Sequence, residues 1–325
     1  MKTFRIGIDL GGTKIELVVL DETDHIIHKQ RIVTPHGDYD HTLDSICNLV
    51  WEAEHLINQK CSVGIGTPGA ISQKTGLLKN SNSTCLNDKP IQQDLEQKLG
   101  RKIRLSNDAN CFTLSEACDG AAAGSQNVFG VIIGTGTGAG IVINQQIVEG
   151  ANRIAGEWGH NPMPWPNHSE IPGPTCYCGL SGCIETFLSG PGLEADYLRS
   201  FNTALNSHEI VAGAVAGDTA AKETMIESKK TYNPNCEAAL QRYEERLARA
   251  LSHVINILDP DTIVLGGGMS NIKRLYENVP RLWGKYVFSD LVLTKLKPPK
   301  HGDSSGVRGA ARLWAIGEND GRNKR

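Results

Sequence analysis

The sequence lacks a strong excess of either charge, a long hydrophobic run, and cysteines at disulfide-framework spacings. Its 33 lysines and arginines nearly balance its 36 aspartates and glutamates, and the formal net charge of −3 gives no electrostatic reason to expect nucleic acid or a membrane as partner. No stretch approaches the roughly 18 apolar residues of a membrane helix. Residues 1–6 run directly into a strand pattern, so we expect no signal peptide. Of the nine cysteines, six are scattered through the chain, so we expect reduced thiols and a cytoplasmic protein.

One histidine and three cysteines form the most specific pattern that is present. They are His160, Cys176, Cys178 and Cys183. Three thiolates and one imidazole complete a tetrahedral zinc set and leave no position for catalytic water, so we expect a structural zinc. The alternative is a chance cluster or a disulfide, but a Cys-x-Cys pair bridges poorly to itself. The metal would also fix the neighbouring carboxylates of Glu157 and Glu185.

Two glycine-rich turns stand at matching places in the two halves of the chain. The first, residues 9–14, joins strand patterns at Phe4–Asp9 and Ile15–Leu20; the second, residues 134–140, follows a strand pattern at Val128–Ile133. Exposed backbone N–H groups in such turns bind phosphate well, although each turn alone could be a plain tight hairpin. The repetition predicts a duplicated α/β core, and at 325 residues we expect two domains.

Two better-known nucleotide motifs do not apply. A P-loop requires Gly-Lys-Ser/Thr before a helix, whereas Gly12-Thr13-Lys14 stands between two strand patterns. Residues 64–69 match the dinucleotide spacing Gly-x-Gly-x-x-Gly, but Pro68 removes an N–H from the turn that should bind pyrophosphate. We therefore reject a nicotinamide enzyme.

The chain also contains an Asn107-Asp108 pair and the glycine run Gly266–Gly268. Together with the histidine–cysteine cluster and the two glycine-rich turns, they resemble the ROK sugar kinases, in the superfamily of actin and hexokinase. The resemblance runs from about residue 4 to 316. It implies a two-domain, actin-like (ribonuclease H-like) α/β fold with an active-site cleft between the domains and a structural zinc loop. The smaller domain is expected at 1–119 with 305–325, and the larger one, with the zinc loop and a helical segment, at 120–304.

The resemblance also assigns roles to individual residues. Those expected to face ATP are Asp9, Gly11, Gly12, Thr13 and Lys14 in the first turn, Gly134, Thr135, Gly136, Thr137 and Gly138 in the second, and Gly266, Gly267 and Gly268 by the adenosine. Those expected to bind the sugar are Asn82, Asn107, Asp108, Glu157, His160 and Glu185. Asp108 would be the catalytic base, with helix N-cap as its alternative role; Asp9 would act through the Mg²⁺ that accompanies ATP.

The resulting hypothesis is an ATP-dependent hexose kinase that phosphorylates the 6-hydroxyl of fructose, with mannose and glucose as further substrates. Residues 79–84, 156–165 and 301–310 favour fructokinases by resemblance. A kinase for N-acetylglucosamine or another hexosamine is the alternative within the family, and a homodimer is what the family implies. A sugar-sensing repressor or other non-catalytic sensor is a more distant alternative, because a repressor needs an additional N-terminal DNA-binding domain and this chain retains Asp108 and both turns.

Overall fold

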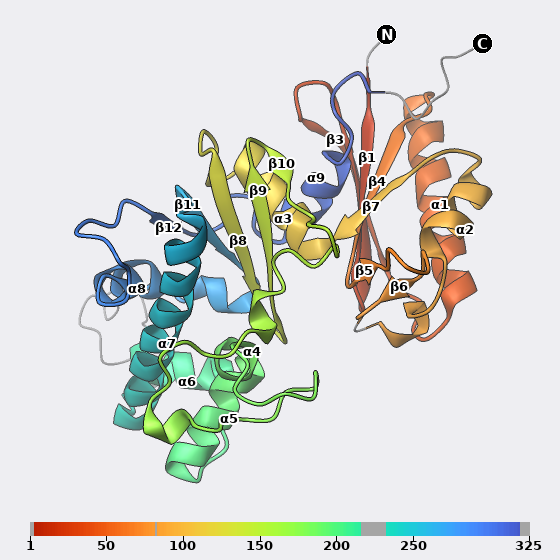
Figure 1. The fold of residues 1–325 in the computed structure, drawn as a ribbon. Helices are drawn as coiled ribbons and strands as arrows, with labels where there is room; N and C mark the ends of the chain where they lie inside the picture. The colour runs from red at the N-terminus through yellow and green to blue at the C-terminus, as the bar shows by residue number, and fades with distance from the viewer. Residues whose placement is uncertain (1–2, 82, 216–231, 319–325) are drawn as a thin grey trace. The chain divides into compact units, whose positions relative to one another are not determined.

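The computed structural model describes residues 3–81, 83–215 and 232–318, which divide into two compact units (Figure 1). Unit 1 contains Met1–Ser125, Gly140–Gly156 and Lys300–Arg325; unit 2 contains Gln126–Ala139 and Glu157–Pro299. The domain boundaries expected from the sequence stay a prediction. Within the described ranges, no helix is both long enough and apolar enough to cross a bilayer.

Unit 1 is built on a mixed sheet of five strands in the order β3-β2-β1-β4-β7. Its strands are β1 (Arg5–Leu10), β2 (Lys14–Leu20), β3 (Ile26–Val33), β4 (Ser62–Thr67) and β7 (Arg104–Asn107). The first three are antiparallel neighbours, whereas β1, β4 and β7 run parallel. A small hairpin of β5 (Ala70–Ile71) and β6 (Leu78–Lys79) and a short 3₁₀ turn, η1 (Thr84–Leu86), follow β4. The strand patterns expected at Phe4–Asp9 and Ile15–Leu20 are confirmed as the antiparallel pair β1 and β2.

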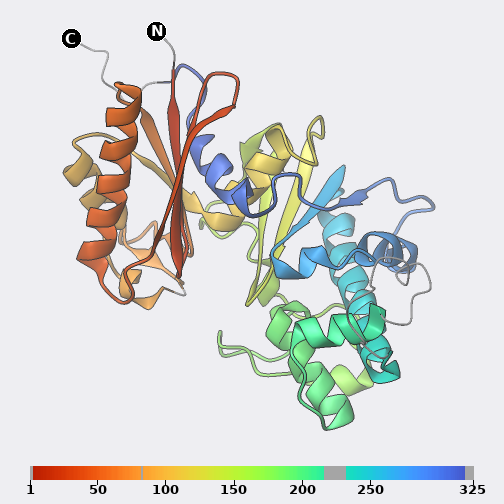
Figure 2. The ribbon, with the colours of Figure 1, turned by 180° about the vertical axis from the view of Figure 1, so that it is seen from behind.

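Helices cover both faces of this sheet, as Figures 1 and 2 show from opposite sides. On one face lie α1 (Tyr39–Ile57) and α2 (Ile91–Leu99); on the other lie α3 (Asp108–Cys118) and α9 (Ser305–Ala311), which follows η6 (Gly302–Ser304). Helix α1 begins where the Asp38 carboxylate caps the N–H of His41 at 2.9 Å. Its apolar face, including Leu43, Ile46 and Val50, is buried in the core of the unit.

Helix α9 packs unusually close to the sheet because glycines face it. A Cβ built on Gly64 of β4 would lie 1.9 Å from the carbonyl oxygen of Ala310, and one on Gly7 of β1 would lie 2.1 Å from that of Val307. Neither position has room for a side chain. Gly64, the first glycine of the 64–69 pattern, is therefore required for the packing of α9 on the sheet. This role agrees with the rejection of a dinucleotide-binding site.

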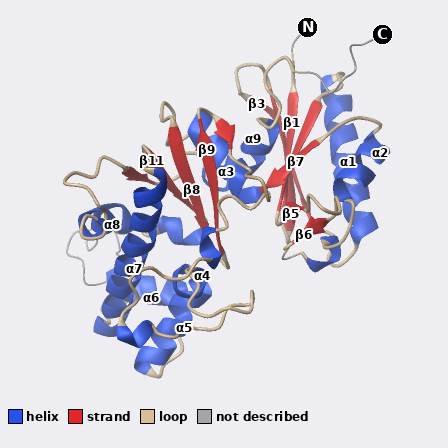
Figure 3. Cartoon of the chain, in the orientation of Figure 1, coloured by secondary structure: helices blue, strands red, loops and turns tan. Residues whose placement is uncertain are grey.

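The second sheet also has five strands, in the order β10-β9-β8-β11-β12. They are β8 (Asn127–Ile133), β9 (Thr137–Ile143), β10 (Gln146–Ile147), β11 (Thr262–Gly266) and β12 (Lys295–Lys297), and β8, β11 and β12 run parallel. Like β1 and β2, strands β8 and β9 are neighbours joined by a glycine-rich turn, which matches the predicted repeat (Figure 3).

The helices of unit 2 follow the glycine turn and the cysteine-rich loop. They are α4 (Glu185–Leu188), α5 (Gly190–Phe201), α6 (Ser207–Val215), α7 (Pro234–Leu258) and α8 (Leu275–Trp283), with short 3₁₀ turns at η2 (Trp158–His160), η3 (His168–Glu170) and η5 (Gly268–Asn271). Helix α7 buries an apolar face that includes Leu240, Leu247 and Leu251.

We predict that Gly64→Ala lowers the free energy of unfolding by about 3 kcal/mol or more, because the new methyl group collides with the backbone of α9 rather than with a movable side chain. Urea unfolding measures this loss. Gly284→Ala is the matched control: a Cβ there meets nothing within 4 Å and the backbone is helical. Equal stabilities for the two variants would contradict the packing argument.

Candidate active site

Unit 1 places two carboxylates at the ends of neighbouring elements. Asp9 lies near the end of β1, and Asp108 is the first residue of α3, where its Oδ1 accepts the N–H of Ala109 at 2.8 Å. Burial, followed by the charge of Asp108, raises the pKa of Asp9 to about 7. The charge of Asp108 therefore opposes the ionisation of Asp9. A bound cation would reduce this repulsion between the two carboxylates.

Asn107, rather than Asp108, caps helix α3. Its side-chain oxygen accepts the N–H of Ala109 at 2.9 Å, and its amide nitrogen donates to the carbonyl oxygen of Gly69 at 3.1 Å. The amide is thus held from both ends, which fixes its direction. Because Asn107 is the N-cap residue of α3, the alternative role of Asp108 as a helix N-cap is wrong.

The first glycine turn is a short hairpin with an exposed tip. The N–H of Gly11 donates to the carbonyl oxygen of Lys14 at 3.0 Å, while the carbonyl oxygen of Gly11 accepts the hydroxyl of Thr34 at 2.7 Å. Gly12 and Thr13 at the tip are exposed. A turn that is anchored at its base and open at its tip can receive an anion without rearranging.

The second glycine turn is tied to Glu185. The N–H of Thr137 donates to Glu185 Oε2 at 2.8 Å, and the N–H of Gly134 donates to the carbonyl oxygen of Gly136 at 2.9 Å. Two of the N–H groups expected to face phosphate are thus already bonded, leaving those of Thr135 and Gly136 at the exposed tip for that role. Glu185, expected to bind sugar, also connects the turn to the start of α4.

The third glycine segment ends β11 and begins η5. Gly267 has a φ of +76°, and a Cβ there would lie 2.4 Å from the carbonyl oxygen of Ile133 at the end of β8. Gly268 has nothing within 4 Å of an added Cβ, whereas Gly266 is a buried strand residue. Gly267 is therefore required by a close approach of strand ends, and Gly268 borders open space.

The histidine and three cysteines converge as the sequence predicts. Their ligand atoms all lie within 4.8 Å of one another. Cys178 Sγ is 3.7 Å from Cys183 Sγ, and Cys176 Sγ is 3.6 Å from His160 Nδ1. A tetrahedral zinc with Zn–S bonds of about 2.3 Å separates its sulfurs by about 3.8 Å, whereas a disulfide requires about 2.05 Å. The geometry fits a metal and excludes the disulfide alternative; none of the nine cysteines, all of which the structure describes, is in a disulfide.

Tyr177 lies beside this cluster and was missed by sequence reasoning. Its hydroxyl is 2.9 Å from Nε2 of His160, the nitrogen that points away from the cysteines. Tyr177 is 83% exposed; partial desolvation of its hydroxyl, followed by the charges of Glu185, Cys176 and Glu157, raises its pKa to about 12. Because Tyr177 lies close to all three, Glu157, His160 and Glu185 lie in the same small region of unit 2. Its position between two cysteines in sequence was the available signal.

The cysteine-rich loop is also anchored to α7 by a buried ionic network that sequence reasoning missed. Glu170 accepts from Arg246 at 2.6 Å and from Arg249 at 2.9 Å, and Arg246 also pairs with Asp196 at 2.9 Å. All four side chains are buried. The loop thus has a fixed end that does not depend on a metal.

The structure accordingly brings the predicted site residues together in two groups. Asp9, Asn107 and Asp108 belong to unit 1, whereas Glu157, His160 and Glu185 belong to unit 2. Asn82 lies outside the described residues. That the two groups face one cleft stays a prediction.

A sequence profile of the ROK family matches residues 5–316. The chain belongs to the ROK family. It is 38% identical, over 94% of its length and 98% of the relative's, to an N-acetyl-D-glucosamine kinase of Photobacterium profundum. It is 37% identical, over 94% of its length and 97% of the relative's, to the enzyme of that name from Yersinia pseudotuberculosis serotype O:1b.

Among solved structures, the ROK hexokinase of Thermus thermophilus superimposes with a TM-score of 0.80 at 28% identity, covering 96% of this chain and 97% of that one. The predicted actin-like α/β fold is therefore confirmed. The fructokinase prediction is wrong, because the curated relatives are N-acetyl-D-glucosamine kinases. It rested on the resemblance of residues 79–84, 156–165 and 301–310 to fructokinases, and the sequence alone does not reveal the pocket around the 2-position of the sugar.

We predict that Asp9→Asn removes a pH dependence of stability in protein that is free of Mg²⁺. A folded-state pKa near 7, above the unfolded value of about 3.9, means that Asp9 stabilises the fold at low pH and that this stabilisation is lost as pH rises through 7. The unfolding free energy of the variant minus that of the wild type should therefore increase by up to about 1.4 kcal/mol per pH unit between pH 5 and 7. Urea unfolding across this range measures the difference; a constant difference would contradict the burial argument.

Proposed function

We propose that this protein is an ATP-dependent kinase that phosphorylates N-acetyl-D-glucosamine at its 6-hydroxyl. The observation that carries the proposal is 38% identity to a curated kinase of that name over 94% of the chain. The Asn107-Asp108 pair, at the start of α3 in unit 1, would supply the general base and a sugar-binding amide. Because the curated relatives are kinases, a catalytic role is also favoured over that of a non-catalytic sensor.

Asp108 is the proposed general base. Phosphoryl transfer depends mainly on positioning and charge neutralisation, and one carboxylate must accept the proton of the attacking hydroxyl. The bond from the N–H of Ala109 holds Asp108 at the first turn of α3. Asn107, held from both ends, would orient a neighbouring sugar hydroxyl. Glu157, His160 and Glu185 would bind further hydroxyls from unit 2.

The glycine turns are the proposed phosphate-binding elements. The exposed tip at Gly12 and Thr13 and the exposed Thr135 and Gly136 offer backbone donors to the ATP phosphates, with Gly268 beside the adenosine. Mg²⁺ bound with ATP would neutralise phosphate charge, and Asp9 would hold its water ligands. That cation would also favour the ionised form of Asp9, whose pKa is raised in its absence.

A structural zinc held by His160, Cys176, Cys178 and Cys183 is part of the proposal, since the spacing of their ligand atoms fits one. Such a metal would fix the loop that carries Glu157 and ends at Glu185. Held through Nδ1, the imidazole of His160 would keep Nε2 directed at Tyr177 or at a substrate hydroxyl.

Removal of the metal should lower the melting temperature and abolish activity together, because the binding energy of a structural zinc is also folding energy. Mass spectrometry of the native protein should find about one Zn²⁺ per chain, and scanning calorimetry after chelation should show the lost stability. Cys176→Ser should behave like the chelated protein, whereas Cys85→Ser, at a thiol outside the cluster, should not. An unchanged melting temperature without zinc would contradict a structural role.

Asp108→Asn should lower kcat by about 10²–10⁴-fold, the typical contribution of a general base, while leaving the sugar's binding constant nearly unchanged. Asparagine retains the size and the acceptor oxygen but cannot take the proton. Single-turnover kinetics and sugar titration separate the two quantities. Activity within tenfold of the wild type would remove Asp108 from the base role.

A coupled ADP-release assay tests the proposed substrate. With Mg-ATP, kcat/KM for N-acetylglucosamine should exceed the values for glucose, mannose and N-acetylmannosamine, by analogy with the curated relatives. A preference for an unacetylated hexose would retain the kinase and overturn the substrate. No turnover on any of these sugars by folded, zinc-containing protein would overturn the kinase itself.

A further inference from the structure

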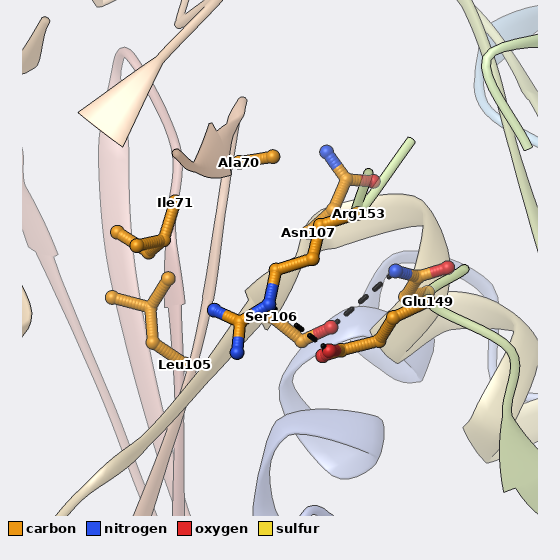
Figure 4. A pocket seen from close by; sticks show the side chains of 8 residues that line it. Ala70, Ile71, Leu105, Ser106, Asn107, Glu149 and Arg153 are labelled. Atoms are coloured by element: carbon orange, nitrogen blue, oxygen red, sulfur yellow. Dashed lines mark hydrogen bonds and ion pairs between the residues drawn. The ribbon is translucent and has the colours of Figure 1, made fainter. Parts of the chain in front are cut away.

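A small pocket opens beside Asn107, entirely within unit 1 (Figure 4). It lies among β5, the end of β7, the first turn of α3 and the segment after β10. Its lining is Ala70, Ile71, Leu105, Ser106, Asn107, Asn110, Glu149 and Arg153. Figure 4 shows Ile71 and Leu105 on one side and Glu149 on the opposite side. The pocket therefore combines an apolar wall with a polar rim.

Asn110 contributes a buried polar atom without a partner. The residue is only 8% exposed, and its amide nitrogen is 3.4 Å from Ser106 Oγ. Its Oδ1 has no hydrogen-bond partner among the described residues. Turning the amide over exchanges the two ends and still leaves one of them unpaired. A buried polar group in this state is costly, and a ligand that supplies the missing partner removes the cost.

Arg153 supplies a donor at the rim of the same pocket. Its φ of +53° is a conformation that side-chain-bearing residues rarely adopt, so the surrounding structure holds it there. Its Nε is 3.4 Å from Glu149 Oε2, and its guanidinium also contacts the amide of Gln73. Since it has five N–H donors, Arg153 can keep these contacts and still bind a carbonyl oxygen.

Asn107 connects this pocket to the proposed reaction. It lines the pocket, caps the helix that starts with Asp108, and donates to the carbonyl oxygen of Gly69, the residue before Ala70. A hexose whose hydroxyl is bound by Asn107 would therefore have a neighbouring ring substituent at the mouth of the pocket.

We propose that this pocket is the subsite for the 2-acetamido group of the sugar, with Asn110 and Arg153 as its specificity-determining polar residues. Asn110 Oδ1 accepts the amide N–H, Arg153 donates to the acetyl oxygen, and the methyl group contacts Ile71 and Leu105. A bare hydroxyl at the 2-position would leave the apolar wall empty and at least one polar group unpaired, so the pocket discriminates by its chemistry. The inference rests on the proposed kinase function.

Two variants test the subsite from opposite walls. Asn110→Ala removes the buried amide, and Ala70→Leu fills the apolar side. Each should lower kcat/KM for N-acetylglucosamine by roughly tenfold or more, mainly through KM, while changing the value for glucose less than about threefold. Asn48→Ala, at an exposed position on α1, is the matched control and should change neither sugar. Thermal stabilisation by each sugar without ATP gives an independent readout of binding.

The outcomes separate this inference from the proposed function. If wild-type protein phosphorylates N-acetylglucosamine but Ala70→Leu leaves the ratio of the two sugars unchanged, the subsite is wrong and the kinase stands. A parallel loss for both sugars would make these residues structural and would also overturn the subsite. If Asn110→Ala fails to fold, Ala70→Leu alone decides. If the wild type prefers glucose, both the proposed substrate and the subsite fail.

Discussion

The close approach of α9 to the first sheet is the constraint on which unit 1 depends. Gly64 and Gly7 face the backbone of α9 directly, with no space for a Cβ. At the start of the same helix, a Cβ on Gly306 would lie 3.2 Å from Oδ2 of Asp9. The helix therefore reaches the carboxylate near the end of β1, so residues 305–311 pack against a strand from near the start of the sequence.

The same packing extends to α3, which carries Asp108. At Gly309 a Cβ would lie 1.7 Å from the carbonyl oxygen of Cys111, so α9 and α3 also meet backbone to backbone. At the far end of α3, the buried Glu116 carboxylate accepts the hydroxyl of Ser305 at 2.7 Å and the N–H groups of Ala121 and Lys300 at 2.7 and 3.0 Å. One carboxylate thus fastens the helix that positions Asp108 to the segments of unit 1 that precede and follow unit 2 in the sequence.

Sequence patterns predict the parts of this molecule that chemistry restricts to few residue types. The spacing of Cys176, Cys178 and Cys183, and the repeated glycine turns, identified the cluster and the family correctly, because metal geometry and tight turns tolerate few alternatives. The patterns could not show that Glu185 bonds to Thr137, that Tyr177 reaches His160, or how Asn110 and Arg153 line a pocket. These contacts depend on tertiary structure and leave no periodic signal. The sugar was mispredicted for the same reason.

A crystal structure with N-acetylglucosamine and a non-hydrolysable ATP analogue tests the central claim most directly. We expect the 6-hydroxyl oxygen within about 3.2 Å of the Asp108 carboxylate, the distance that proton transfer requires, and the acetamido group against Ile71 and Leu105. A sugar that places another hydroxyl at Asp108, or an acetamido group directed away from the Asn110 pocket, would contradict it.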